Sequence, residues 1–325
     1  MSGPVALARV TRSGVVESVH LGHVAVCDAE GELVAHAGDP DRLVFARSSL
    51  KPLQAAVSLG FIGDDISDDE AAVMCGSHTG EPAHVRAVRS ILARGALTED
   101  SLRCPPAWPA HPDDARAYVE ARPLLHNCSG KHAGMLLACT RAHFAADGYL
   151  ESDHPVQRAI LDAVTSVAGT KPHAVGVDGC GAPAPAVPLR AMATLFARLA
   201  TPAPIDQLGR EIGRATSAMR TSPYLVAGRD RMDSELMQGV DGLLVKSGAE
   251  GLACAGVSSG GVGVAVRVDD GSTRAAGPAL IRALQLLGVV DERPADAILR
   301  LAHPAVTGGG RAVGALTSHF VLENP

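Results

Sequence analysis

The sequence predicts an α+β fold in which strands from both ends of the chain form one antiparallel sheet flanked by helices. Three observations predict it. Valine-rich extended segments occupy residues 16–28 and 31–39, helical periodicity fills the long middle, and short Val/Gly-rich strands return after Gly239. This order lacks the strand–helix alternation that builds a parallel sheet, so a doubly wound parallel fold is disfavoured.

The N-terminal strands are separated by Ala29-Glu30-Gly31, a break typical of a hairpin. The first helix begins near Ser49, and Pro52 fits its first turn because the N–H that proline lacks has no partner there. Further helices are expected near residues 68–75, 82–94, 131–144, 155–168, 188–199, 206–220 and 275–287. Gly- and Pro-rich breaks are expected at residues 104–114 and 178–188.

The 325 residues are enough for one large domain or two closely packed ones. We expect a single unit over residues 1–325, with a sheet subregion at 1–60 and 239–325 and a mainly helical subregion at 61–238. Hydrophobic residues make up 46% of the chain but aromatic residues only 3%, which predicts a core built from Ala, Val and Leu.

Composition argues against several classes of function. The net charge is −6 with both signs mixed along the chain, and no basic run indicates a nucleic-acid partner. No apolar stretch approaches the roughly 18 residues of a membrane span, and no signal peptide is recognisable, so we expect a cytoplasmic protein. The seven cysteines are odd in number and scattered, which does not suggest a disulfide framework.

Two short motifs, far apart in the chain, suggest acyl-transfer chemistry together. Ser48 and Lys51 stand three residues apart at a helix start, where a lysine can take the proton of a serine hydroxyl. Lys246-Ser247-Gly248 lies on a strand after the helical middle, and the pair S-x-x-K with a distant K-[ST]-G marks serine acyl-transferases. Read alone, Ser48 is better explained as a helix N-cap, because S-x-x-K occurs by chance in many chains. The alternative for Lys246 is an edge-strand lysine that prevents further strand pairing.

Two further segments carry polar groups at predicted helix ends. Residues 75–81 offer Ser77 as a second hydroxyl, although the S-D-N element of the β-lactamase class is absent. Cys128 and Lys131 open a helix and Cys180 lies in a glycine turn, so two thiolates are available to Zn²⁺. The usual four-ligand spacing is missing, and from the residues alone the better explanation is a buried Cys128, an independent Cys180 in a turn and a solvated Lys131.

Four blocks in order make the chain resemble a known family. RSSLKPLQA, SHTGE, HNCSGKHAGML and VDGCGAP are similar to the bacterial L-asparaginases of the Rhizobium etli inducible type, the asparaginase II-like family. The resemblance covers nearly the whole chain. It implies a serine β-lactamase/transpeptidase-like fold, a homodimer, and two Ser-Lys pairs beside a zinc site.

Carried over position by position, the resemblance implies three groups of site residues. These are catalytic Ser48, Lys51, Ser77 and Lys246; substrate-binding Arg47, His132 and Asp178; and zinc ligands Cys128, Lys131 and Cys180. The short SHTGE block allows an alternative register in which Thr79 replaces Ser77.

The expected reaction is hydrolysis of the side-chain amide of L-asparagine to L-aspartate and ammonia. Ser48 would attack with Lys51 as its base, while Ser77 and Lys246 pass the proton onward; the opposite assignment, with Ser77 as nucleophile, stays open. Two other functions also stay open: a β-lactamase-like peptidase or esterase, and a non-enzymatic zinc-dependent amino-acid-binding protein.

Overall fold

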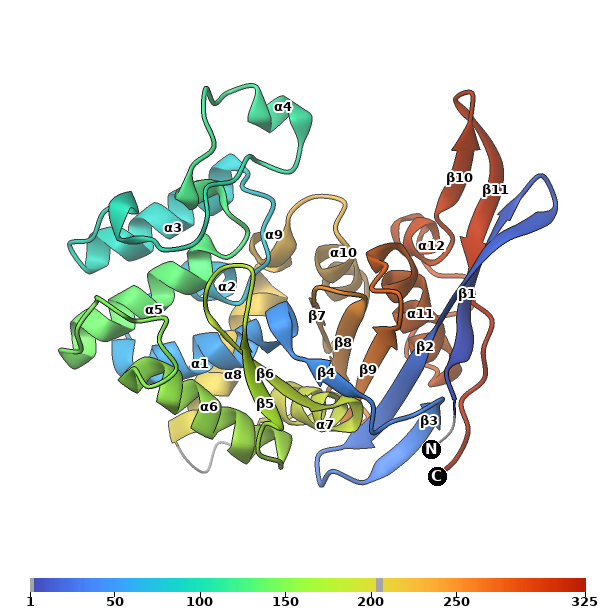
Figure 1. Ribbon diagram of the computed structural model, residues 1–325, viewed down its shortest axis with the longest axis horizontal. Helices are drawn as coiled ribbons and strands as arrows, with labels where there is room; N and C mark the ends of the chain where they lie inside the picture. Colours follow the sequence, from blue (N-terminus) through green and yellow to red (C-terminus); the bar gives the residue numbers. More distant parts are fainter. Residues whose placement is uncertain (1–2, 203–206) are drawn as a thin grey trace. The chain divides into compact units, whose positions relative to one another are not determined.

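A computed structural model describes residues 3–202 and 207–325 of the chain (Figure 1). Its contacts divide the chain into two compact units. The first, here called the sheet unit, comprises Met1–Ser49, Val187–Thr201 and Glu235–Pro325. The second, the helical unit, comprises Leu50–Ala186 and Pro202–Ser234. The boundary between the two units, after Ser49, therefore falls within the Ser48–Lys51 motif.

The sheet unit is built on long and short strands from both ends of the chain. They are β1 (Val5–Arg12), β2 (Val15–Asp28), β3 (Leu33–Ala37), β4 (Leu43–Phe45), β7 (Leu243–Ser247), β8 (Leu252–Val257), β9 (Val262–Val268), β10 (Ala305–Gly308) and β11 (Arg311–Thr317). Its helices are η1 (Arg47–Leu50), α7 (Leu189–Ala200), α11 (Thr273–Leu286) and α12 (Asp296–Ala302). The helix α10 (Met232–Gly239) begins in one unit and ends in the other.

The main sheet pairs the first strands of the chain with the last. Its order is β10-β11-β1-β2-β9-β8-β7, with β3 also pairing β2, and each pairing reported for it is antiparallel. At its centre Val24 of β2 lies opposite Val266 of β9, and both side chains are completely buried. The predicted α+β class, with one antiparallel sheet from the two ends of the chain, is confirmed.

The helix α7 covers the sheet through positions without side chains. An added Cβ at Gly263 of β9 would lie 2.0 Å from the backbone oxygen of Ala193, and one at Gly256 of β8 would lie 2.2 Å from that of Phe196. Real Cβ atoms do not approach this closely, so only glycine allows the helix to lie directly against these strands.

The helical unit contains mainly helices and one short strand pair. Its elements are α1 (Lys51–Ile62), α2 (Asp68–Met74), α3 (Pro82–Arg94), η2 (Glu99–Ser101), α4 (Pro112–Ala115), η3 (Pro123–Leu125), α5 (Ser129–Ala142), α6 (Pro155–Ala168), β5 (Ala174–Val177), β6 (Pro183–Pro188), α8 (Gln207–Thr221) and α9 (Pro223–Ala227). The central helix is α1, which contacts α5, α6 and α8 and buries most of its residues.

Local sequence signals explain where these helices start. Ser67 caps α2 by accepting a hydrogen bond from the Glu70 N–H, while the Glu70 carboxylate accepts from the Ser67 N–H. This reciprocal pair satisfies two N–H groups that the first helical turn leaves without partners. Prolines open α1, α3 and α6, where the missing N–H is not needed.

Several elements differ from the sequence prediction, including the short helices α4, α9, α10 and α12 and two strand regions. The proline-rich stretch predicted as a break over residues 178–188 contains β6, in which Pro183 and Pro185 pair with Val177 and Val175 of β5. The hairpin of β10 and β11 was also not predicted as strands, because its glycines weaken the alternating pattern. Within the described residues, no helix combines the length and apolar character needed to cross a membrane.

Candidate active site in the helical unit

Lys51 is the first residue of α1, and its ammonium group is held by the ends of two neighbouring segments. The side chain is completely buried. Its Nζ lies 2.7 Å from the Gly76 carbonyl oxygen and 3.0 Å from that of Asn127. It also lies 3.0 Å from Ser77 Oγ. The lysine of the S-x-x-K motif therefore contacts the second predicted hydroxyl directly.

This geometry suits a proton acceptor. A neutral lysine amine has two N–H donors and one lone pair, and the two carbonyl oxygens can only accept. If they take both N–H groups, the lone pair of Lys51 faces the O–H of Ser77. The charged form can instead donate to all three oxygens. These three oxygens are therefore compatible with both the charged and the neutral form of Lys51.

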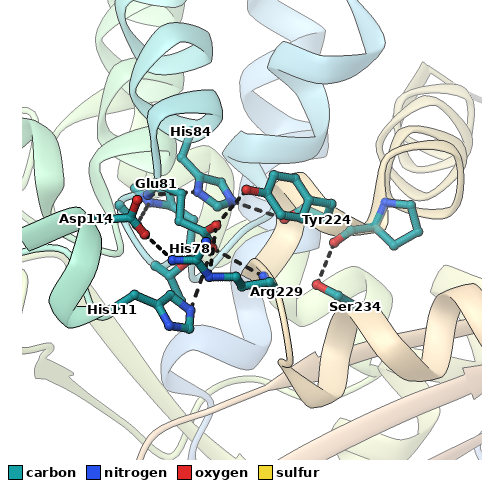
Figure 2. Close-up of polar contacts among 11 residues, drawn as sticks. His78, Glu81, His84, His111, Asp114, Tyr224, Arg229 and Ser234 are labelled. Atoms are coloured by element: carbon teal, nitrogen blue, oxygen red, sulfur yellow. Dashed lines mark hydrogen bonds and ion pairs between the residues drawn. The ribbon is translucent and has the colours of Figure 1, made fainter. Parts of the chain in front are cut away.

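The loop that carries Ser77 is anchored by a buried carboxylate. Figure 2 shows Glu81 among polar side chains from several helices and loops. Glu81 is 2% exposed and accepts hydrogen bonds from Thr79 Oγ1 at 2.5 Å and Tyr224 Oη at 2.7 Å. The backbone N–H of Arg229 donates to it at 3.2 Å. Burial alone would raise the pKa of Glu81, but these hydrogen bonds outweigh it and hold the pKa below its usual value.

Two stacked histidines continue this network (Figure 2). The His78 and His84 rings stack at 5.0 Å, and His84 stacks on Tyr224 at 5.2 Å. Burial, with the charges of His84 and Lys51, holds the pKa of His78 well below its usual value, so this ring is neutral. Its Nδ1 accepts from the Gly80 N–H, and its Nε2 lies 3.0 Å from Ser129 Oγ. The loop of residues 75–81 is thereby tied to the start of α5.

The start of α5 and the turn after β5 bring the predicted zinc ligands together. Lys131 Nζ lies 3.2 Å from Cys180 Sγ and 4.0 Å from Asp178 Oδ2. Cys128 and Cys180 interact through a side-chain hydrogen bond, and Cys128, Lys131 and Cys180 are each buried. Residues from segments about 50 positions apart thus form one cluster of two thiols and an amine.

The two thiols share one proton. The hydrogen bond from Cys180 lowers the pKa of Cys128 well below its usual value; burial opposes this, and the charges of Lys51 and Lys131 assist it. The same hydrogen bond and burial raise the pKa of Cys180. Burial lowers the pKa of Lys131, but the charges of Cys128, Cys180 and Asp178 outweigh it and raise that pKa above its usual value. The lowered pKa of Cys128 favours its thiolate form, and the raised pKa of Lys131 favours its charged form.

Sequence reasoning did not identify Tyr149, which lies against a predicted site residue. His132 Nδ1 lies 2.6 Å from Tyr149 Oη, and both side chains are buried. Burial and the charge of Lys131 hold the pKa of His132 well below its usual value. Tyr149 stands in a Gly- and Asp-rich connection with no periodic pattern, so no sequence signal pointed to it.

The predicted site residues Arg47 and Ser48 belong to the sheet unit and precede the first helix of the helical unit. Arg47 is one of the few residues other than glycine with a positive φ, at 44°, a strained conformation that is common at functional sites. Ser48 is half-buried, whereas the neighbouring Ser49 is buried and donates to the Lys246 carbonyl oxygen at 3.2 Å.

Lys246 itself lies on the edge strand β7, yet its side chain is completely buried. Its Nζ donates to the Ser247 carbonyl oxygen at 2.9 Å. A lysine that only blunts a sheet edge points into water, so the buried side chain of Lys246 needs another explanation.

The sequence profile described as L-asparaginase II matches residues 8–318. A search of curated proteins gave no match. Among solved structures, Mglu in its native form is similar, with 15% sequence identity and a TM-score of 0.48. The similarity covers 85% of this chain and 66% of Mglu, so this chain spans slightly less than two thirds of the length of Mglu. A probable glutaminase from Bacillus subtilis complexed with 6-diazo-5-oxo-L-norleucine is similar with 12% identity and a TM-score of 0.45, over 82% of this chain and 84% of that chain.

Proposed function

The chain belongs to the L-asparaginase II family, and from this premise we propose that it hydrolyses the side-chain amide of L-asparagine to L-aspartate and ammonia. Family membership supports an amidohydrolase as the reaction class. The observation that carries the proposal is the hydrogen bond between Lys51 Nζ and Ser77 Oγ, because it joins a buried base to a hydroxyl.

In the proposed mechanism Ser48 attacks the amide carbon and Lys51 receives the proton. An oxygen–carbon bond forms to the serine, the carbon–nitrogen bond breaks, and the proton passes through Ser77 to the leaving nitrogen to give ammonia. Water then cleaves the ester to aspartate and restores the serine. The roles of Arg47, Ser48 and Lys246 come from the family resemblance, whereas the role of Ser77 also has the support of its contact with Lys51.

The nucleophile can be identified by trapping. A diazoketone analogue of asparagine alkylates the attacking side chain, and peptide mass spectrometry reads out its position. A label on the peptide that contains Ser48 supports the assignment. A label on Ser77 reverses the two serine roles, with Lys51 as base in either case.

Zinc is the second part of the proposal. The described residues contain no group of three or more His, Cys, Asp and Glu side chains arranged to hold a metal ion. The buried cluster of Cys128, Lys131 and Cys180 still fits, because the lowered pKa of Cys128 favours the thiolate that a metal binds and the other two donors can bind once they lose protons. These three residues would hold Zn²⁺, which supplies positive charge for orienting the substrate.

One assay separates the proposed function from the others. Ammonia release is measured with asparagine, glutamine and β-aspartyl substrates, with and without added Zn²⁺. The proposal is supported if the wild-type protein releases ammonia from asparagine and the Lys51→Met variant does not. Turnover of nitrocefin without ammonia release supports the peptidase or esterase, and tight asparagine binding without turnover supports a binding protein.

We also propose that the chain is a homodimer, which light scattering with size-exclusion chromatography tests.

A further inference from the structure

Tyr149 has a hydroxyl group whose hydrogen bonds can be assigned completely. The backbone N–H of Arg103 donates to Tyr149 Oη at 3.2 Å, so the oxygen already acts as an acceptor. The remaining neighbour of this oxygen is His132 Nδ1 at 2.6 Å. Tyr149 is 1% exposed, so water does not reach the hydroxyl from the surface. The tyrosine proton therefore has one acceptor among the described residues, the Nδ1 of His132.

This assignment fixes the state of His132. An imidazole nitrogen that accepts a hydrogen bond carries no proton, and in the neutral ring the proton then sits on the other nitrogen. A ring protonated on both nitrogens would donate from Nδ1 and leave the buried tyrosine proton without an acceptor. Each neutral tautomer leaves one buried donor without a partner within the described residues, either the tyrosine O–H or the imidazole Nε2–H. The hydrogen bonds of Tyr149 itself are satisfied only when His132 is neutral with its proton on Nε2.

The Nε2–H of His132 is then a donor without a partner. His132 is completely buried, and its Nε2 is a buried atom with no hydrogen-bond partner in the described part of the chain. A buried donor without a partner is unfavourable, and a ligand that supplies the acceptor removes this cost. His132 follows Lys131 in sequence and feels the charges of Cys128 and Lys51, which places it beside the groups of the candidate site.

We propose that Tyr149 is a positioning residue that holds His132 in its Nε2–H tautomer, leaving a fixed N–H donor for a carboxylate or carbonyl oxygen of the amino-acid substrate. The substrate part of this proposal rests on the proposed function; the tautomer does not. The same assignment excludes Nε2 as a metal ligand in this state, because a ligating nitrogen needs a free lone pair.

The first experiment measures the tautomer directly. Long-range ¹H–¹⁵N spectra of the histidine-labelled protein distinguish a protonated ring nitrogen from an unprotonated one. We expect an unprotonated Nδ1 and a protonated Nε2 for His132, and a shift of the Nε2–H signal when L-aspartate or L-asparagine is added. A protonated Nδ1, or both nitrogens protonated at neutral pH, would overturn the assignment whether or not the protein releases ammonia.

The second experiment removes the hydroxyl that sets the tautomer. In Tyr149→Phe the ring stays but the proton donor is lost, so the Nδ1 signal of His132 should move toward the protonated form. The kcat/KM for asparagine should fall about tenfold to a hundredfold, the range typical of residues that orient a functional histidine. A matched control is Tyr224→Phe, which removes a hydrogen bond to Glu81 and should leave the His132 nitrogen signals unchanged.

A pair of substitutions at His132 tests the donor itself. Glutamine carries an N–H₂ group near the position of Nε2, whereas leucine fills the space without a donor. His132→Gln should therefore bind asparagine with a lower KM than His132→Leu, with matched folded fractions checked by circular dichroism. Equal KM values for the two variants, with the wild-type tautomer intact, would refute the substrate contact and leave only a structural role for Tyr149.

Discussion

Lys51 Nζ lies 3.0 Å from Ser77 Oγ across 26 residues of sequence. The two residues come from the start of α1 and from the loop after α2, and both belong to the helical unit. The contact therefore depends on how α1, α2 and α5 pack, and the local spacing of Ser48 and Lys51 does not determine it. A base whose position is set by helix packing is sensitive to changes in those helices.

The hydroxyl of Ser77 should be needed for turnover. Ser77→Ala removes the side-chain oxygen that lies 3.0 Å from Lys51 Nζ and leaves the carbonyl oxygens of Gly76 and Asn127 in place. Ammonia release should fall about 10²- to 10⁴-fold, the usual contribution of a group that transfers a proton. A suitable control is Ser58→Ala on α1, the helix that begins with Lys51, which loses only a bond to the Gln54 carbonyl oxygen. Equal activities of the two variants would exclude Ser77 from the mechanism.

The charge of Glu81 should stabilise the protein at neutral pH. Because its pKa lies below the usual 4.5, the carboxylate contributes stability above that value and loses it as the pH falls through the folded pKa. Glu81→Gln should lower the free energy of unfolding by about 1–3 kcal/mol at pH 7. The difference from wild type should shrink under acidic conditions in urea melts.

An exposed ion pair provides the comparison for that variant. Glu17 pairs with Arg12 at 2.9 Å, and both side chains are more than 40% exposed, at 43% for the arginine and 47% for the glutamate. Glu17→Gln should change the free energy of unfolding by no more than about 0.5 kcal/mol. An equal effect of the two substitutions would mean that the hydrogen bonds to Glu81 add no stability.

Zinc affinity should rise with pH. The raised pKa of Lys131 and the proton shared by Cys128 and Cys180 mean that protons must leave before the three groups can act as ligands. Competition with a chromophoric chelator should give tighter binding at about pH 8 than at about pH 6, with proton release into a weak buffer. Cys180→Ser should weaken zinc binding. Cys139→Ala should not, because Cys139 lies on α5 with Lys131 but outside the cluster. An affinity independent of pH would argue against this ligand set.

Gly130 should tolerate no side chain. A Cβ at this position would lie 2.3 Å from the Val73 backbone oxygen, so Gly130→Ala must push α5 away from α2. We expect a loss of about 1–3 kcal/mol in the free energy of unfolding and reduced activity, because Lys131 moves with α5. At Gly213 on α8 the nearest atom is 3.7 Å away, so Gly213→Ala should be neutral or stabilising by up to about 1 kcal/mol. Similar thermal melts for the two variants would contradict this packing.

The helices were predictable from sequence because their signals are local. The prediction of a helix at residues 82–94 coincides with α3, whose apolar positions recur with helical spacing between Pro82 and Gly95. The strand β6 was missed because proline normally marks a break, and its pairing with β5 depends on a distant partner. Local pattern predicts an element; it does not predict which segment the element pairs with.

The candidate site was predictable only in part, for the same reason. The spacing of Cys128, Lys131 and Cys180 matches no common metal-binding motif, so these residues were predicted as ligands only from the family resemblance. The structure brings them into one buried cluster. Tyr149 carried no motif at all. Its significance lies in a buried contact with His132, which is visible only when the two side chains are seen together.

Two of the three recorded hydrogen bonds of Lys51 go to main-chain carbonyl oxygens, those of Gly76 and Asn127. Every amino acid carries that oxygen, so no point mutation deletes it. Natural variation can remove the Ser77 contact by changing residue 77, whereas the two carbonyl contacts change only when a segment is displaced. Among relatives that keep the same backbone, position 77 is therefore where differences in the reactivity of this lysine should be sought first.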